Sequence, residues 1–258
     1  MGNEKHILLR SFVHGLGKAY IAYRRLHPFQ SLPFDRLNLG SAITTVPGWY
    51  NLDYTDHILV DRVPLLRGLL HRLGKLDNTQ YEWHSKGLFR EVHYWDLAIP
   101  LPFLSNSFSF AYSSHVLEHL YLLDVRRFLA ELFRVLKPGG LVRIVIPDLL
   151  IIAKEYVRVS EGLKDDSLLF LGEDISASGG ADMFLSFFYG VAVGDATHQK
   201  LFGHRWMYDF ESLQHYMTEA GFIGIHRLCF REGACPDLDV LDTRPRESLH
   251  VEAIKPTS

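Results

Sequence analysis

The sequence of 258 residues is poor in cysteine and has no long apolar run. Its two cysteines, Cys229 and Cys235, give neither the paired CxxC motifs of a structural zinc site nor a disulfide framework, so a reducing compartment fits best. No stretch approaches the roughly 20 apolar residues that a membrane-spanning helix needs. The first residues, MGNEKHILLRSFVHGLG, lack the continuous apolar core of a secretory signal. We therefore expect a soluble protein of the cytoplasm.

An excess of charge is also absent. The chain carries 27 Lys and Arg against 30 Asp and Glu, which gives a formal net charge of −3. This balance provides no global attraction to the phosphates of a nucleic acid, so we expect no nucleic-acid partner. The length is sufficient for a sizeable core, and it favours one large domain with insertions.

Residues 108–148 indicate the fold class. An apolar run at 108–112 is followed by an amphipathic segment, by Lys-Pro-Gly-Gly at 137–140 and by a second apolar run at 141–146. Lys suits the negative end of a helix, Pro cannot continue it, and Gly supplies the left-handed turn after it. Strand, helix and strand with short connections predict parallel strands joined by a right-handed crossover. We expect an α/β doubly wound, mostly parallel sheet.

Other apolar runs and turn signals extend this sheet. We expect further strands over residues 34–39, 49–52, 89–94, 222–230 and 249–254, and helices over 61–76 and 209–220. Asp209 suits the N-cap of the last helix, and Gly221 suits its end. The first two strands are closer in sequence than the dozen or so residues of a usual parallel crossover, so their connection holds a single helical turn or their limits differ.

Two segments lie outside this alternation. Residues 4–26 place apolar side chains at helical spacing with basic ones elsewhere, which predicts an amphipathic helix. We favour its packing on the domain or on a second copy of the chain, a homo-oligomer, over a membrane surface. Residues 150–207 follow a strand's carboxyl end, where open α/β sheets bind substrates, so we expect a helical cap, with a structural insertion or a dimer surface as the alternative. We predict that the chain consists of an N-terminal amphipathic helix within residues 1–30 and a domain with a helical insertion over residues 31–258.

The motifs along this sheet resemble a known family. SSHVLEHL, RVLKPGG and IPDL at 113–149 resemble the second half of a class I S-adenosylmethionine-dependent methyltransferase, in particular a small bacterial group associated with glycan biosynthesis. LNLG and GWYNLD at 37–53, WDLAIPLPF at 95–103 and SLHVEAIKP at 248–256 continue the resemblance. Their order and spacing make the match specific. The resemblance implies a seven-stranded sheet, S-adenosylmethionine as the cofactor and a methylated acceptor.

The resemblance also implies a cofactor site at the carboxyl ends of the first strands. Asn38, Gly40 and Ser41 correspond to the cofactor loop, in which relatives carry an acidic residue where Asn38 stands and a second Gly where Ala42 stands. Asp53 ends the second strand, where an acidic side chain can accept both hydroxyls of a ribose. The remaining predicted contacts are Asp96 and Leu97 at the adenine, with Asp56 and Asp61 as alternatives, and Ser114.

His115, Glu118 and His119 spell HxxEH, which is also an inverted zinc-protease motif. Zinc ligands four residues apart must share one face of a helix, whereas His115 directly follows a strand. We therefore expect no metal here and expect His115 in the loop above the sheet. In the family that the sequence resembles, the reactive end of the cofactor meets the substrate in this region. Glu118 and His119 are expected to orient the loop and to cap the next helix.

Methyl transfer to an oxygen needs alignment and a base that removes the proton. His115 is the first candidate, because imidazole changes protonation near neutral pH. His198 and His204, from the expected cap, and Asp148, at the end of the fifth strand, are the alternatives.

Trp206 and Tyr208 offer flat apolar faces of the kind that a sugar or an aromatic substrate uses, although such residues also form lid cores. We expect O-methylation of a sugar, a glycan or a small-molecule acceptor. The rival hypothesis is a catalytically inactive, methyltransferase-like binding or scaffold protein. It is suggested by Asn38, Ala42 and Ser109, which stand where relatives carry other residues.

Overall fold

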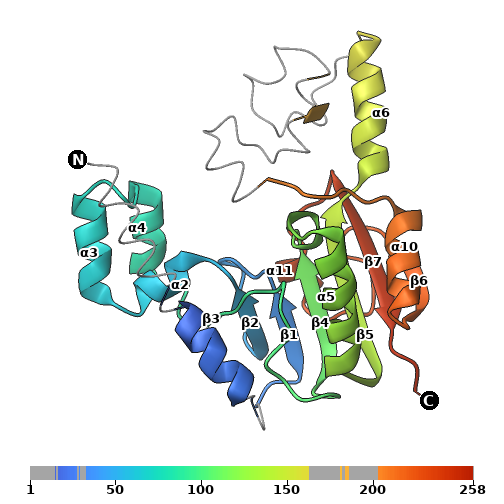
Figure 1. Cartoon of the computed structure of the whole chain (residues 1–258). Helices are drawn as coiled ribbons and strands as arrows, with labels where there is room; N and C mark the ends of the chain where they lie inside the picture. Colours follow the sequence, from blue (N-terminus) through green and yellow to red (C-terminus); the bar gives the residue numbers. More distant parts are fainter. Residues whose placement is uncertain are drawn as a thin grey trace.

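A seven-stranded sheet forms the centre of the computed structural model, in the order β3-β2-β1-β4-β5-β7-β6 (Figure 1). The strands are β1 Arg36–Leu39, β2 Trp49–Asp53, β3 Val92–Tyr94, β4 Phe108–Ser114, β5 Leu136–Pro147, β6 Ile223–Leu228 and β7 Ser248–Ile254. The structure describes residues 15, 17–27, 29, 33–162, 181, 184–185 and 203–257. Strands β1 to β5 are parallel to one another, and β7 is antiparallel to both β5 and β6. The expected doubly wound, mostly parallel sheet is confirmed.

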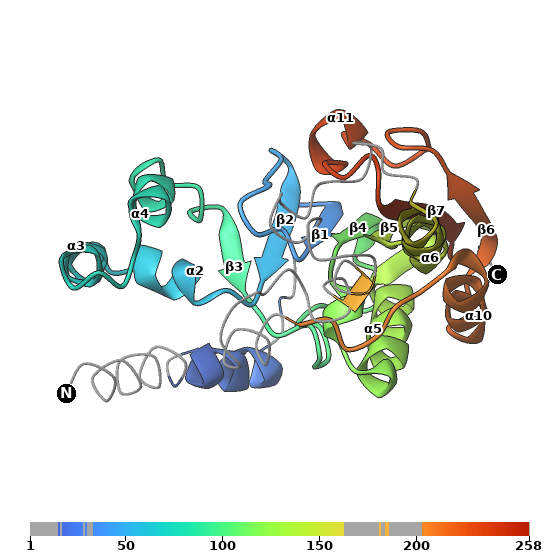
Figure 2. The ribbon, with the colours of Figure 1, turned by 90° about the horizontal axis from the view of Figure 1, so that it is seen from above.

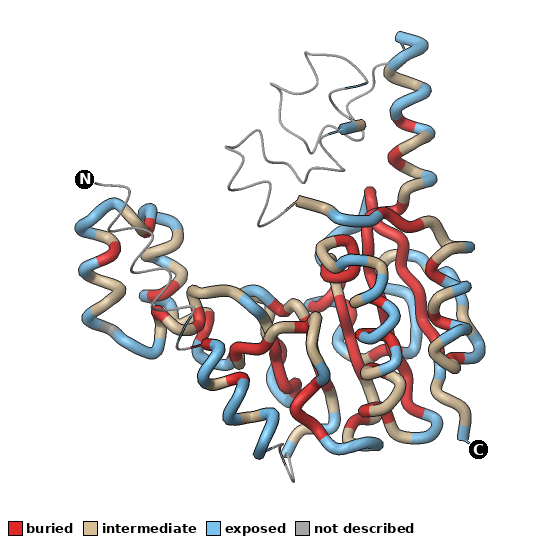
Figure 3. The backbone as a smooth tube through the Cα atoms, viewed as in Figure 1, coloured by how far each residue is buried: buried red, intermediate tan, exposed pale blue. Residues whose placement is uncertain are grey.

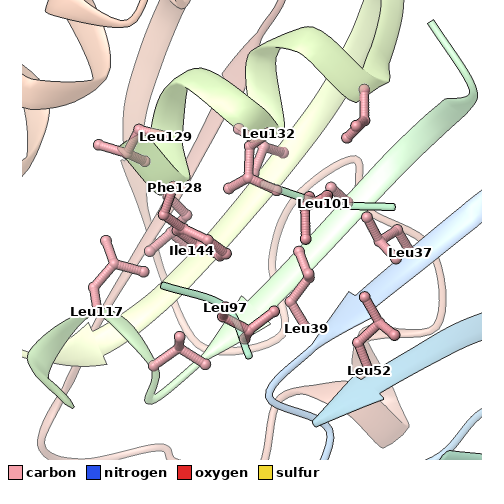
Figure 4. Packing of buried hydrophobic residues seen from close by; sticks show 14 of the residues in the cluster. Leu37, Leu39, Leu52, Leu97, Leu101, Leu117, Phe128, Leu129, Leu132 and Ile144 are labelled. Carbon is pink, nitrogen blue, oxygen red and sulfur yellow. The ribbon is translucent and has the colours of Figure 1, made fainter. Parts of the chain in front are cut away.

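The segment between β4 and β5 folds as its sequence predicts. Helix α5, Leu122–Val135, buries five apolar side chains along one stripe. Figure 4 labels three of them, Phe128, Leu129 and Leu132, in the cluster that also holds Ile144 of β5. Strand β5 begins at Leu136, before the position predicted for it, so the Lys-Pro-Gly-Gly segment lies inside the strand's bounds. Gly139 still supplies the left-handed turn, with φ of +76°.

The two faces of the sheet are covered differently (Figure 2). Helix α5 and the helical residues 17–26 lie on one face, where Ile21 joins the main core. Helix α11, Leu238–Leu241, lies on the other face over a smaller cluster that contains Tyr112 and Val145. In a strand successive side chains point to opposite faces, so Ala111 and Ile144 belong to the first cluster and their neighbours to the second.

Helix α10, Phe210–Glu219, packs beside β6. Its N-cap is Asp209, as predicted, and Asp209 and Ser212 form a reciprocal capping box. Figure 3 shows the central strands buried along most of their length, whereas the helices that cover them are exposed on their outer sides.

A buried ionic network holds the connection between β6 and β7 against the sheet. Arg143 of β5 is fully buried, and its guanidinium contacts both carboxylate oxygens of Asp242, at 3.1 and 2.5 Å. It also donates to Glu252 Oε1, at 3.1 Å, and to the carbonyl oxygen of Glu232, at 2.8 Å. A buried charge is tolerated when partners surround it in this way.

Helices α2, Asp56–Asp61, α3, Pro64–Arg72, and α4, Asn78–Ser85, form a lobe beside β3 (Figure 1). The helix predicted over 61–76 is present with shorter bounds, as α3 from Pro64 to Arg72, while Asp61 ends α2. Proline lacks the backbone N–H that a helix interior needs but is tolerated in the first turn, so a new helix starts there. The short connection between β1 and β2, residues 40–48, contains turns and no helix.

The expected cap begins with α6, Leu149–Ser160, which leaves the carboxyl end of β5 and extends away from the sheet (Figure 1). Much of residues 150–207, including His198, lies outside the described residues, as do residues 4–14 of the predicted N-terminal helix. The burial of Ile21 in the main core agrees with packing of that helix on the domain. Within the described ranges, no helix combines the length and the apolar character that crossing a membrane requires.

Candidate functional site

The loops after β1 and β4 meet at the carboxyl edge of the sheet. Gly40 follows β1 with φ of +71°, and a Cβ atom there would lie 2.1 Å from Cγ2 of Val116, in the loop after β4. A side chain at this position is excluded both by the left-handed backbone and by the close approach of Val116. The conformation of the predicted cofactor loop therefore depends on glycine at position 40, where the backbone lies close to Val116.

Asp53, the predicted ribose ligand, also binds this loop. Its Oδ2 accepts a hydrogen bond from the backbone N–H of Ala42, at 2.8 Å, and its Oδ1 accepts one from Thr55, at 2.9 Å. Burial raises the pKa of Asp53, and the backbone hydrogen bonds from Ala42, Thr55 and Tyr54 oppose that rise. Each carboxylate oxygen has two lone pairs, so Asp53 retains acceptor capacity for a ligand.

Asn38 is buried on the face of the sheet opposite Leu37 and Leu39. Its amide nitrogen donates to the carbonyl oxygen of Thr44, at 3.0 Å, and to Oδ1 of Asn51, at 2.9 Å. These contacts use both amide hydrogens, which leaves the carbonyl oxygen as the group that could accept a hydrogen bond from an ammonium.

Asp96 and Leu97 follow β3 as predicted. The half-buried carboxylate of Asp96 accepts a hydrogen bond from the backbone of Ala98, at 2.9 Å. Leu97 is buried in the main core beside Leu39 and Leu117 (Figure 4). The remaining predicted cofactor residues are close by: Ser41 is buried directly after Gly40, and the carbonyl oxygen of Ser114 lies 3.6 Å from the position of a Cβ on Gly40.

His115 lies immediately after β4, at the expected place above the sheet. Its backbone is left-handed, with φ of +54°, an uncommon conformation for a residue other than glycine. One ring nitrogen, Nδ1, lies 3.1 Å from Oε1 of Glu118, and the other, Nε2, lies 3.0 Å from Oγ of Ser248. The imidazole is thus placed between a carboxylate and a hydroxyl.

Glu118 is fully buried in the short helix η1, Leu117–His119. Burial raises its pKa, but the hydrogen bond from His115 and the charges of His115, His119 and His204 outweigh burial, so the net pKa is lowered. An ionised carboxylate at Nδ1 favours the tautomer that carries its proton there, which leaves the lone pair on Nε2 of His115. Glu118 therefore orients the loop, as predicted.

The prediction that Glu118 and His119 cap the next helix is wrong. The N-cap of α5 is Tyr121, and no side chain makes a capping hydrogen bond there. Both residues instead belong to η1, whose buried side faces the segment before α10. The backbone N–H groups of Arg205 and Trp206 donate to the carbonyl oxygen of Glu118, at 2.6 and 3.3 Å.

The other predicted catalytic residues have different surroundings. His204 lies next to His119, and the centroids of the two rings are 4.9 Å apart. His198 is not among the described residues. Asp148 is fully buried at the N-cap of α6, where it accepts a hydrogen bond from Leu150, at 2.9 Å, and an ion-paired one from Arg227, at 2.6 Å. Its carboxylate has a structural role in this helix start.

Trp206 and Tyr208 also differ. The side chain of Trp206 is 45% exposed, close to the cluster through its backbone contact with Glu118. Tyr208 is fully buried and its ring packs edge-to-face on Tyr216. Burial, with a contribution from the charge of Glu118, raises the pKa of the Tyr208 hydroxyl. Trp206 is therefore the member of this pair that offers an accessible aromatic face.

Ser248 was not among the sequence-based candidates. It is 133 residues from His115 and begins the antiparallel strand β7. A strand that runs opposite to its neighbours starts where theirs end, so its first residue reaches the carboxyl edge. Recognition of an antiparallel last strand in the sequence could have identified Ser248 as a residue at this edge.

Comparison with known proteins agrees with this geometry. A family model described as a methyltransferase domain matches residues 81–144, and no curated protein matches the chain. The chain is similar to the CurJ carbon methyltransferase at 12% identity and a TM-score of 0.43, over 89% of this chain and 50% of that one. It is similar to the S-adenosylmethionine-dependent methyltransferase SibL at 14% identity and a TM-score of 0.43, over 86% and 50%.

A third similar structure is phosphoethanolamine N-methyltransferase 2 of Haemonchus contortus in complex with S-adenosyl-L-methionine, at 14% identity and a TM-score of 0.40, over 94% of this chain and 52% of that one. The chain spans about half the length of each of these three proteins. The first of them is described as a carbon methyltransferase and the third as an N-methyltransferase.

The sheet is that of a class I methyltransferase-like fold. The matched methyltransferase domain suggests S-adenosylmethionine as the cofactor to compare with this edge of the sheet. Two side chains at the carboxyl edge have the chemistry that such a cofactor would need: Asn38 has a carbonyl oxygen that could accept from an ammonium, and Asp53 has a carboxylate that could accept from ribose hydroxyls, while the space beside Gly40 is taken by Val116.

Proposed function

We propose that the protein transfers a methyl group from S-adenosylmethionine to a hydroxyl of a sugar, glycan or other small-molecule acceptor, with His115 as the base. The observation that carries this proposal is the contact of 3.1 Å between Nδ1 of His115 and the buried carboxylate of Glu118. A carboxylate that fixes the tautomer of a histidine at a loop edge is the arrangement of a general base and its orienting group.

The contacts proposed for the cofactor lie at the carboxyl edge of the sheet. Asn38 would accept a hydrogen bond from the ammonium, Asp53 would bind the ribose hydroxyls, and Asp96 with Leu97 would meet the adenine. Gly40, Ser41 and Ser114 would line the part of the site that lies between the ammonium, the ribose and the adenine. When bound, the cofactor supplies an electrophilic methyl group on a sulfonium.

The proton of the acceptor hydroxyl would pass to Nε2 of His115. In the resting protein Nε2 lies 3.0 Å from Oγ of Ser248, which can donate to it and keeps the ring aimed toward the edge of the sheet. Glu118 stabilises the imidazolium that forms, and water then removes the proton. Holding the hydroxyl and the methyl group in line accounts for the rest of the barrier reduction.

Trp206 supports a sugar as the acceptor. Its half-exposed indole lies on the segment that is hydrogen-bonded to the backbone of Glu118, so a sugar ring stacked on it would lie near His115. The glycan class rests on the resemblance of the sequence, and the aromatic face is the feature of the site that suits it.

Cytoplasmic action is part of the proposal. Both cysteines are free thiols, Cys229 exposed and Cys235 buried, which suits a reducing compartment. A membrane-surface role for residues 4–26 is the less favoured alternative, because Ile21 is buried in the main core.

Calorimetric titration with S-adenosylmethionine and S-adenosylhomocysteine, followed by methyl-transfer assays on sugar and phenol acceptors, tests the proposal. We expect micromolar binding of both cofactor forms and turnover of at least one hydroxyl acceptor. The rival, an inactive binding protein, is favoured by Asn38, whose amide cannot neutralise an ammonium. Cofactor binding without transfer to any acceptor class would support a cofactor-only form of that rival. Absence of binding would reject the enzyme and favour a binding or scaffold protein that uses no cofactor.

A further inference from the structure

Three side chains of metal-ligating type converge beside the proposed base. One carboxylate oxygen of Glu118 and one ring nitrogen each of His119 and His204 all lie within 4.8 Å of one another. Glu118 and His119 belong to η1, whereas His204 comes from the segment before α10. The sequence separates these groups by about a third of the chain, and the fold brings them together.

Glu118 has acceptor capacity that the dyad with His115 does not use. It is fully buried, and Nδ1 of His115 lies 3.1 Å from its Oε1, while among the described residues no hydrogen-bond donor reaches Oε2. A buried carboxylate with unused lone pairs is costly unless a cation or a donor satisfies them. The two imidazoles that face it are half-buried and accessible to a small ion.

The distances suit closure on an ion. Nitrogen and oxygen ligands lie about 2.0–2.2 Å from zinc, so ligands at tetrahedral angles are roughly 3.4 Å apart. The present spacing of up to 4.8 Å exceeds this by about 1.4 Å, a distance of the size that rotation of imidazole rings about their side-chain bonds can cover.

The backbone around the cluster is already fixed. The N–H groups of Arg205 and Trp206 donate to the carbonyl oxygen of Glu118, and Nε of Arg205 donates to that of His119, at 2.8 Å. Hydrogen bonds of this kind hold first-coordination residues in place and raise the affinity of metal sites. They keep His204 next to η1 although it lies far away in sequence.

We propose that Glu118, His119 and His204 form a binding site for one divalent transition-metal ion of the zinc type. Two imidazoles and one carboxylate favour such an ion over magnesium, which prefers oxygen ligands. Three protein ligands leave a coordination position open to water or to an oxygen of the acceptor. This set differs from the HxxEH motif of the sequence, because His115 lies outside it and His204 takes its place.

The test uses the full chain without a polyhistidine tag, stripped with EDTA and titrated with Zn²⁺ in competition with a chromophoric chelator. We expect one ion per chain, and at least about a tenfold loss of affinity in His119→Ala and in His204→Ala. His215→Ala is the matched control, because this exposed histidine also lies beside a carboxylate, 3.3 Å from Glu219. Its affinity for Zn²⁺ should equal that of the native chain.

Absence of stoichiometric binding to the native chain, or binding that persists in both variants, would overturn the proposal. The Co²⁺ complex of the native chain gives a second readout: intense visible bands are expected from a tetrahedral site, and a spectrum of hydrated Co²⁺ would contradict it. Thermal unfolding in EDTA shows whether each variant is folded. Neither cofactor nor acceptor is present, so failure here leaves the methyl-transfer proposal standing.

Discussion

The carboxylate of Asp53 accepts a hydrogen bond from the backbone N–H of Ala42, at 2.8 Å, and so joins the end of β2 to the loop after β1. The residue predicted to bind ribose is thus also the residue that fixes the loop predicted to surround the cofactor. A change of Asp53 is therefore expected to alter both the affinity for the cofactor and the conformation of the loop after β1.

Asp53→Ala should weaken the binding of S-adenosylhomocysteine by at least about tenfold, because it removes a ribose acceptor together with the loop's anchor. Calorimetry measures the affinity. Asp35→Ala, a surface carboxylate paired with Lys137 near the start of β1, is the control and should bind as the native chain does. Equal affinity of Asp53→Ala and Asp35→Ala would show that the ribose site lies elsewhere.

Ala42→Gly should stabilise the protein. Ala42 has φ of +45°, where the Cβ of an L-residue costs about 1 kcal/mol that glycine does not pay, and a more flexible unfolded chain offsets part of this gain. We expect a net gain of up to about 1 kcal/mol in the free energy of unfolding, measured in urea, and cofactor affinity at least equal to the native value. A loss of stability would mean that the methyl group of Ala42 makes contacts that outweigh the strain.

His115→Gln should lower kcat by about 10²- to 10⁴-fold with little change in cofactor affinity, because a general base acts only in the transition state. Glu118→Gln should lower kcat less, since it disturbs the orientation of the imidazole and leaves the base in place. Single-turnover assays and calorimetry separate the two effects. If His115→Gln retains full activity, His198, His204 and Asp148 become the candidates for the base.

The pair of Arg143 and Asp242 should dominate the stability of the face that carries α11. Arg143→Met leaves a buried carboxylate without its partner, so we expect a loss of about 3–5 kcal/mol in the free energy of unfolding. Arg36→Met is a matched control, because Arg36 also pairs with an aspartate, Asp237 at 2.7 Å, but at the surface, where about 1 kcal/mol or less is expected. Similar losses in the two variants, measured by denaturant unfolding, would contradict this distinction.

Acid should destabilise the lobe formed by α2 to α4. Burial, reinforced by the charge of His84, lowers the pKa of His57 below its usual 6.5. The unfolded chain therefore takes up a proton at higher pH than the folded chain, and this part of the stability is complete above about pH 6.5 and decreases as the pH falls.

Urea unfolding between about pH 7 and pH 5 measures this dependence. His57→Phe, which keeps a ring beside Phe89, should show a flatter dependence than the native chain. His215→Phe, at an exposed position, should keep the native slope. Equal slopes in all three proteins would assign the acid sensitivity to other groups.

Elements defined by local chemistry were predictable from the sequence. Asp209 as an N-cap followed by Ser212 specifies a helix start within four residues, and the apolar stripe of α5 specifies its buried face. The helix predicted over 61–76 is confirmed at its centre, but its start was placed too early because the apolar periodicity continues across Pro64, where α3 begins.

Contacts between distant segments could not be predicted in the same way. Ser248 reaches His115 only because β7 is reversed, and His204 reaches Glu118 only because two backbone N–H groups hold its segment on η1. Both depend on the assembled sheet and on no local pattern. Asp53 and Asp96 each follow a predicted strand and Asn38 lies inside one, whereas their contacts with a cofactor were implied by the family resemblance and stay a prediction.

Strand β7 lies between β5 and β6 although it follows both of them in the sequence. During synthesis on the ribosome, these two strands therefore wait with open hydrogen-bonding edges until residues 248–254 have left the exit tunnel. Over that interval Arg143 lacks Glu252, and the apolar side chains of β5 lack half of their neighbours. A nascent chain stalled before this strand would be a target for chaperones and a source of aggregates.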